Sequence, residues 1–353
     1  MSIAVEQLRK SFGSQQVLDS ISESFAQGCI SVLLGASGCG KTTTLRCIAG
    51  LERPTGGRIV IDECTVYQES PPVWVPPERR RVAMVFQSYA IWPHMTVFEN
   101  VALPLVAAGM GKPAIKQAVL ETLHMVGLDS YAGRSVTELS GGQQQRVALS
   151  RCIVSESPVI LMDEPLSNLD ARLRIAMRGE VRELQRRLKR TILFVTHDQE
   201  EAMSIADTVY LYHDGRVIQK GAPKDIYDNP ASRYAAEFLG RANILSNYEW
   251  TEGPRGAAYR LAGGACLPAA PGGPPAQGAM LCIRPEKWRL VNPERAAIAG
   301  RIASTSFIGD RTEYWIDTAF GQIAAVELNA AVRRPGEAVG LEVAAHDIRI
   351  IGE

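Results

Sequence analysis

Three glycines, one lysine and three hydroxyl residues lie close together in residues 35–43, GASGCGKTT. A glycine-rich turn of this kind, after a strand and before a helix, lets backbone N–H groups curl around a phosphate. Lys41 then reaches the outer phosphate oxygens, and the Thr42 hydroxyl is a ligand for Mg²⁺. The segment predicts a nucleotide-phosphate site made of Gly35, Ser37, Gly38, Cys39, Gly40, Lys41, Thr42 and Thr43.

An acidic pair ends the apolar run at residues 159–165, VILMDEP. A carboxylate at the end of a buried strand beside such a turn holds Mg²⁺, usually through water, and Asp163 is predicted to do so. Glu164 follows at once, placed to orient or deprotonate an attacking water. Such a pair on its own is more often a solvated strand end. The glycine-rich turn upstream is what favours hydrolysis of a nucleoside triphosphate here.

A second glycine turn precedes a predicted helix at residues 139–151, LSGGQQQRVALSR. The free N–H groups at a helix N-terminus also bind phosphate. A chain that binds one nucleotide has no evident use for two phosphate cradles. The residues alone therefore leave the role of this second turn open.

Strands and helices alternate up to about residue 235, and these elements must position the residues above. Strands are predicted at residues 30–35, 57–63, 81–87, 159–165 and 191–198. Helices are predicted at residues 41–50, 113–128 and 171–190. Alternation of this kind implies a largely parallel α/β sheet.

The pattern changes after Gly240, where short strand-like pieces indicate a small all-β unit. They lie at residues 279–286, 300–310, 312–318, 321–328 and 337–351. A glycine- and proline-rich stretch, residues 263–278, precedes them. It is either a disordered linker or a long loop inside the β domain, and the strands on both sides favour the loop. We place the boundary near Gly240.

Composition bounds the possible functions. The chain has 353 residues, which suits two domains, and a formal net charge of +0. This balance does not favour nucleic acid or an anionic membrane as a partner. The start of the chain does not resemble a secretory signal, and no apolar run is long enough to span a bilayer. The seven cysteines form no CxxC pair, so we expect free thiols in a reducing cytosol.

Residues 139–143, LSGGQ, are the signature of ABC-type ATPases, and the chain resembles that family over essentially its whole length. The resemblance implies a P-loop ABC ATPase domain at residues 1–239, with a helical subdomain at about 88–157. It also implies a homodimer in which each signature faces the glycine-rich turn of the partner chain. ATP then lies between the chains, capped by Ser140, Gly141, Gly142 and Gln143.

Other family motifs follow in order along the chain. Gln87 occupies the position that contacts Mg²⁺ or water and leads toward a membrane subunit. Asp170, in SNLD, matches the loop that crosses the dimer interface. His197, in FVTHD, matches the histidine that holds the γ-phosphate and the catalytic water. Phe12 lies where the family places an aromatic ring under adenine, with a core aromatic as the alternative.

The C-terminal segments IRPE (283–286) and SFIGDRTEYWI (306–316) resemble the transport-associated OB-like domain of importer ATPases, which implies such a domain at residues 240–353. The implied function is to energise a binding-protein-dependent importer from the cytoplasmic side of the inner membrane. Permease subunits would be direct partners, and a periplasmic or lipid-anchored solute-binding protein an indirect one. Importers of ferric iron, phosphonate, polyamine, sulfate or sugar all remain open. The alternative is a soluble ABC ATPase of macromolecular assembly or nucleic-acid metabolism.

Overall fold

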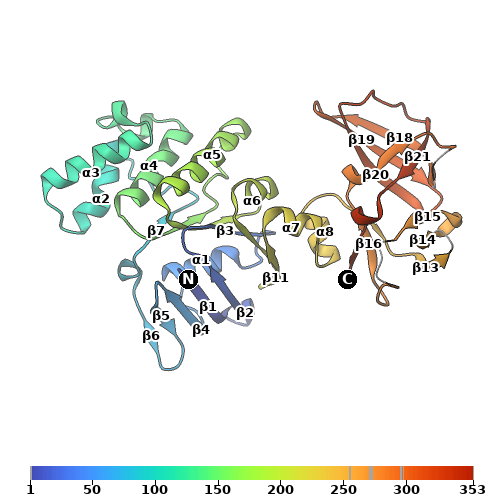
Figure 1. Ribbon diagram of the computed structural model, residues 1–353. Helices are drawn as coiled ribbons and strands as arrows, with labels where there is room; N and C mark the ends of the chain where they lie inside the picture. Colours follow the sequence, from blue (N-terminus) through green and yellow to red (C-terminus); the bar gives the residue numbers. More distant parts are fainter. Residues whose placement is uncertain (1, 254–255, 270–272, 295, 297, 353) are drawn as a thin grey trace. The chain divides into compact units, whose positions relative to one another are not determined.

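The computed structural model describes residues 2–253, 256–269, 273–294, 296 and 298–352. The chain forms two compact units, Met1–Lys224 and Asp225–Glu353 (Figure 1). Each unit is described by itself. The domain bounds expected from the sequence, 1–239 and 240–353, stay a prediction.

A six-stranded sheet forms the centre of the first unit. In spatial order its strands are β11 (Arg216–Gly221), β10 (Thr208–His213), β3 (Ile30–Gly35), β9 (Thr191–Thr196), β8 (Val159–Asp163) and β7 (Val82–Val85). All neighbours pair in parallel except β11, which runs antiparallel to β10. Every residue of β3, β8 and β9 is buried, as expected for parallel strands covered on both faces. The predicted parallel α/β sheet is confirmed here.

A second sheet of five strands is antiparallel throughout, and the sequence pattern did not predict it. Its spatial order is β2 (Gln15–Phe25), β1 (Ile3–Phe12), β4 (Gly56–Ile61), β5 (Cys64–Gln68) and β6 (Val73–Trp74). The expectation of a largely parallel sheet is wrong for this segment. Strand β4 was predicted as a strand, but its pairing depends on partners that no local pattern specifies.

The helices of the first unit are α1 (Lys41–Ala49), α2 (Val97–Ala107), α3 (Lys112–Met125), α4 (Gly141–Val154), α5 (Ala171–Leu188) and α6 (Gln199–Ile205). Helices α1, α3, α4 and α5 lie where the sequence predicted helices, whereas α2 and α6 were not predicted. Helices α2, α3 and α4 lie together in Figure 1. They share a separate apolar cluster that includes Val101, Val119 and Val147. Because this cluster has its own core, the three helices form a distinct part of the first unit.

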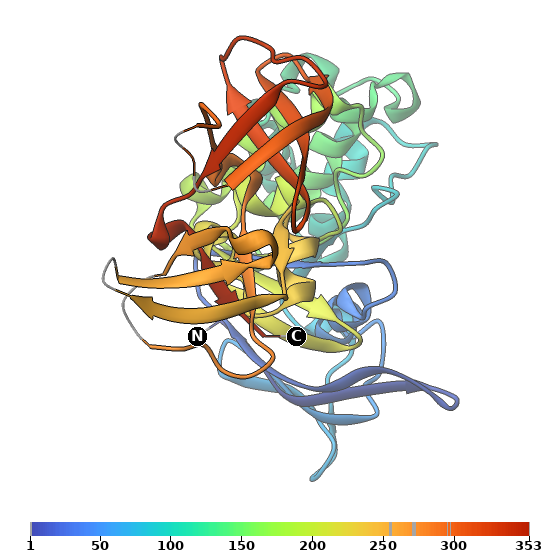
Figure 2. The same cartoon turned by 90° about the vertical axis from the view of Figure 1, so that its right-hand side faces the viewer.

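In its described residues the second unit carries two short α-helices, α7 (Pro223–Asp228, which begins in the first unit) and α8 (Arg233–Phe238), and three sheets (Figure 2). The sheets have the orders β12-β16-β22, β13-β14-β15 and β17-β21-β18-β19-β20. The strands are β12 (Asn243–Leu245), β13 (Tyr248–Gly253), β14 (Gly256–Leu261), β15 (Cys266–Pro268), β16 (Met280–Ile283), β17 (Arg289–Val291), β18 (Ile298–Phe307), β19 (Arg311–Thr318), β20 (Gly321–Leu328), β21 (Ala338–Glu342) and β22 (Arg349–Ile351).

The glycine- and proline-rich stretch at residues 263–278 begins inside this β unit. Strand β15 lies within it and pairs with β14. Residues 270–272 lie outside the described residues. The stretch therefore starts as part of a sheet, which agrees with the favoured interpretation for its first half.

Candidate active site

The carboxyl ends of β3, β8 and β9 place the predicted site residues at one edge of the large sheet. These strands are neighbours and run parallel, so their ends meet there. Strand β3 leads into the loop of residues 36–40, β8 ends at Asp163, and β9 ends at Thr196, just before His197. Three segments far apart in the sequence thus converge.

Glycines allow the loop after β3 to turn tightly. Gly38 and Gly40 have φ of +82° and +104°, a region that side chains with a Cβ rarely occupy. A Cβ at Gly35 would lie 2.5 Å from the backbone oxygen of Tyr212 on β10. The loop and its neighbouring strand approach too closely for any larger residue at position 35.

Lys41 begins helix α1 and folds back over this loop. Its side chain is buried, and Nζ donates hydrogen bonds to the carbonyl oxygens of Gly35 (2.8 Å) and Ala36 (2.7 Å). The Cys39 Sγ lies 3.6 Å from the same nitrogen. Burial raises the pKa of the Cys39 thiol, although the nearby Lys41 charge acts in the opposite direction. The loop therefore holds the Lys41 ammonium in one position, close to the neutral Cys39 thiol.

Thr42 and Asp163 form an oxygen-rich pair beside the loop. The Thr42 hydroxyl donates to Asp163 Oδ1 at 2.8 Å, and Arg46 lies 3.6 Å from Oδ2. Asp163 is buried at the end of β8. A hydroxyl and a carboxylate oxygen are the donor types that Mg²⁺ prefers, so this pair fits the predicted metal ligands. Gln87, the third predicted metal ligand, is exposed. Its backbone carbonyl oxygen accepts a hydrogen bond from the Asn168 side chain at 2.9 Å.

Glu164 and His197 are brought together by the adjacency of β8 and β9. His197 Nδ1 lies 3.3 Å from Glu164 Oε2, and the Glu164 N–H donates to the Val195 oxygen at 3.1 Å. Glu164 has φ of +45°, a conformation that costs energy for a residue with a side chain and is typical of functional sites. A carboxylate paired with a half-exposed imidazole can orient a water and hold a proton.

The second glycine turn forms the N-terminus of α4. Ser140 and Gln143 form a capping box, in which each side chain accepts a hydrogen bond from the backbone N–H of the other. Gly142 packs closely, because a Cβ there would lie 2.9 Å from Leu173 on α5. The hydrogen bonds described for Ser140 and Gln143 do not reach the Lys41 loop, and α4 and α1 lie apart in Figure 1. Within one chain the two cradles remain separate.

Asp170 and Phe12 complete the set of predicted residues. Asp170 caps α5, accepting a hydrogen bond from the Leu173 N–H at 2.9 Å. The Phe12 side chain is exposed, so it is not a core aromatic, and the Lys10 ammonium lies 4.5 Å from the centre of its ring.

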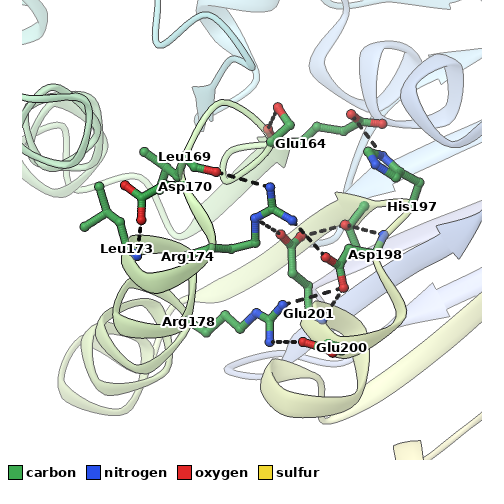
Figure 3. Close-up of polar contacts among 12 residues, drawn as sticks. Glu164, Leu169, Asp170, Leu173, Arg174, Arg178, His197, Asp198, Glu200 and Glu201 are labelled. Carbon is green, nitrogen blue, oxygen red and sulfur yellow. Dashed lines mark hydrogen bonds and ion pairs between the residues drawn. The ribbon is translucent and has the colours of Figure 1, made fainter. Parts of the chain in front are cut away.

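Sequence reasoning missed a cluster of charged residues next to His197. Arg174 and Arg178, one turn apart on α5, lie against Asp198 and Glu201 (Figure 3). A long polar helix was predicted at residues 171–190, but its inward-facing arginines were not distinguished from its exposed ones. Their spacing of four residues, which places both on one face, was the available signal.

Comparison with known proteins agrees with this geometry. Residues 18–167 match the family described as ABC transporter, and residues 281–351 match the TOBE domain. The Fe(3+) ions import ATP-binding protein of Brucella melitensis biotype 1 is 44% identical over 326 residues, covering 92% of this chain and 90% of the relative. The protein of that name from Escherichia coli O157:H7 is 39% identical over 353 residues, covering 99% and 98%.

The chain belongs to the ABC transporter family. Two solved structures share the fold of this ABC ATPase. One, from Clostridium perfringens, is cbiO1, described as part of an ABC transporter complex (TM-score 0.58, 27% identity, covering 64% of this chain and 90% of that one). The other is a bacterial ABC transporter cassette solved as a dimer (TM-score 0.54, 29% identity, covering 63% and 98%).

Membership settles the general function of this ABC ATPase. It binds ATP and is the ATP-hydrolysing subunit of an importer. The importer interpretation is thus confirmed over the alternative of an assembly or nucleic-acid factor. The C-terminal TOBE domain is the predicted OB-like domain. In the part of the chain that the structure describes, no helix is long and apolar enough to cross a membrane.

Proposed function

We propose that this ABC ATPase drives ferric-iron import and that each of its ATP sites is built from two copies of the chain. The identity to Fe(3+) import proteins over 92% of the chain carries the choice of substrate. The composite site is supported by the exposed start of α4, which does not reach the Lys41 loop of its own chain. It is also supported by the related cassette that was solved as a dimer.

One face of this site would hold the triphosphate. The loop of residues 35–43 would surround the β-phosphate with N–H groups, and Lys41 would exchange its bonds to Gly35 and Ala36 for phosphate oxygens. The pair of Thr42 and Asp163, with Gln87, would hold Mg²⁺. When bound, the ion would neutralise charge on the phosphate oxygens. Phe12 would support the adenine ring through its open face.

The reaction itself would depend on Glu164 and His197. The Glu164 carboxylate would orient the attacking water and take up its proton. His197, 3.3 Å away, would contact the γ-phosphate and hold the same water. Ser140, Gly141 and Gly142 of the second copy would donate from the start of α4 to the γ-phosphate. Asp170 would lie at the interface between the copies.

Membrane subunits would bind the part of the first unit formed by α2, α3 and α4. Trp92 is 47% exposed and Val106 58% exposed, which leaves apolar surface for a partner helix. The chain would therefore lie at the cytoplasmic side of the membrane. It would act on iron only through permease subunits and an external binding protein.

The test is ATP hydrolysis by the complete transporter in lipid vesicles. Binding protein loaded with Fe³⁺ should raise the hydrolysis rate severalfold, because substrate delivery is what the ATPase responds to. Binding proteins loaded with phosphonate, polyamine, sulfate or sugar should not. A complex carrying Glu164→Gln is the matched control, and loaded binding protein should not raise its hydrolysis rate. Stimulation by one of the other loaded proteins, with none by iron, would overturn the assigned substrate.

A further inference from the structure

Arg174, in the first turn of α5, connects three segments around the candidate active site. Its Nη2 donates to the Leu169 carbonyl oxygen at 3.2 Å, and its Nη1 donates to Asp198 Oδ2 at 3.1 Å. Its Nε lies 3.7 Å from Glu201 Oε1. Figure 3 shows the guanidinium between the loop that ends at Asp170 and the segment that follows His197. One side chain thus contacts both the loop that ends at Asp170 and the segment that follows His197.

The far side of this contact is a fixed network around His197. The Thr196 hydroxyl donates to Glu201 Oε2 at 2.6 Å and accepts from the Asp198 N–H at 2.9 Å. Asp198 Oδ1 accepts from the Glu201 N–H at 3.1 Å and so caps α6. The residues on both sides of His197 are therefore held by hydrogen bonds, so a displacement of Asp198 would pass to its neighbour His197.

The network includes a buried carboxylate, Glu201, whose charge is compensated by nearby arginines. Glu201 is buried with 3% of its surface exposed. Burial raises the pKa of its carboxyl, while the hydrogen bond from Thr196 and the charges of Arg174 and Arg178 act in the opposite direction. A buried carboxylate needs such partners to remain charged. Arg174 and Arg178 share this compensation, so removing either one still leaves a positive charge near Glu201.

We propose that Arg174 is a positioning residue that transmits the position of the loop ending at Asp170 to His197, so that hydrolysis begins when a second copy engages that loop. This rests on the proposed roles of Asp170 and His197. The guanidinium is planar, so its donors move as a rigid fork. A shift of the Leu169 carbonyl therefore shifts Asp198 as well. None of the described hydrogen bonds and ion pairs of the Arg174 side chain reaches a residue proposed to touch ATP.

Arg178 offers a matched control on the next turn of the same helix. It lies 3.6 Å from Asp198 Oδ1 and donates to Glu200 Oε2 at 3.2 Å. None of its described contacts reaches the loop ending at Asp170. It shares with Arg174 its charge, helix and carboxylate partner but lacks the connection to the loop.

The experiment measures steady-state ATP hydrolysis by full-length variants. Arg174→Ala should lower kcat roughly tenfold to a hundredfold, because a small displacement of a reacting group has an effect of that size. The KM for ATP should change by less than about twofold, since the phosphate loop is untouched. Arg178→Ala should keep kcat within about twofold. Arg174→Lys should recover part of the lost rate, because its ammonium can donate to both the Leu169 carbonyl oxygen and Asp198, although it lacks the rigid fork of the guanidinium.

A double-mutant cycle shows whether the effect passes through His197. In a His197→Ala background, Arg174→Ala should cost little further rate, since residues that act as one unit are not additive. An equal loss in that background, an equal loss in Arg178→Ala, or no recovery in Arg174→Lys would overturn the proposal. If Glu164→Gln fails to slow hydrolysis by about a hundredfold or more, the proposed site itself is wrong. If it does slow hydrolysis by that much while Arg174→Ala equals the wild type, only this inference fails.

Discussion

Glu164 and Ser140 test the proposal that ATP joins two chains, because each can be changed without removing a proposed Mg²⁺ ligand. In the structure Glu164 is next to His197, while Ser140 lies at the separate N-terminus of α4. The two residues therefore test different halves of the proposed composite site.

Glu164→Gln should slow hydrolysis roughly a hundredfold to ten-thousandfold, because a positioned base or water-orienting group contributes about that much. ATP binding should survive, so ATP should trap a long-lived dimer that size-exclusion chromatography detects against an ADP control. Adding Ser140→Arg should abolish that dimer, since the arginine side chain would occupy the place where the partner's turn contacts the γ-phosphate.

Mixing Lys41→Ala chains with Ser140→Arg chains should restore some ATPase activity, because one intact site can then form from the two different chains. No restoration and no trapped dimer would contradict the composite site.

Helix α1, which carries Lys41 and Thr42, is closed at its C-terminus by a buried arginine. Arg80 Nη1 donates to the carbonyl oxygens of Cys47 (2.7 Å) and Ile48 (3.0 Å), and Nε donates to Val75 at 2.7 Å. Its guanidinium lies 4.6 Å from the centre of the Trp74 ring. Burial lowers the pKa of Arg80 to about 10, so it stays charged at neutral pH and complements the negative end of the helix dipole.

Arg80→Met should destabilise the first unit by about 2–4 kcal/mol, because three carbonyl groups, two of them in buried hydrogen bonds, lose a charged donor. Arg79→Met is the matched control. Arg79 is exposed, and a surface change of this kind costs less than about 0.5 kcal/mol. Denaturant unfolding of the full chain, followed by a probe in the first unit, measures both. A loss below about 1 kcal/mol for Arg80→Met would show that water or a shifted loop replaces the donor.

The two helices that lead into the second unit are held there by one residue of the IRPE segment. Arg284 is buried and donates to the carbonyl oxygens of Tyr227 (3.0 Å), Ala236 (2.8 Å) and Gly240 (3.1 Å). Its guanidinium also lies 4.1 Å from the centre of the Tyr227 ring. Helix α8 and most of α7 therefore behave as part of the β unit.

Arg284→Met should loosen residues 225–241 while leaving ATP binding within about twofold of the wild type, because the change leaves the cassette unaltered. Amide hydrogen exchange across this segment should accelerate by roughly one to two orders of magnitude, which corresponds to about 1.5–3 kcal/mol for a charged hydrogen bond. Arg289→Met, on an exposed position of β17, should leave exchange unchanged. An equal effect of both variants would show that charge, and not this contact, is what matters.

The sequence by itself determined the phosphate loop, the acidic strand end and the signature turn. Each is a local pattern, in which a few residues at fixed spacing specify a turn between two elements. The same locality explains why the predicted strands at β3, β8 and β9 and the helices α1, α3 and α5 agree with the structure. The family motifs then assigned the importer ATPase and its C-terminal domain.

Only the tertiary structure decided which residues meet. Arg79, Arg80 and Arg81 are identical neighbours in the sequence, and packing against α1 buries Arg80 alone. Glu164 and His197 meet because β8 and β9 happen to be adjacent strands, and Arg174 lies against Asp198 only because α5 packs beside α6. These are contacts between distant segments, and their geometry follows from the whole set of packed elements, which a local pattern does not contain.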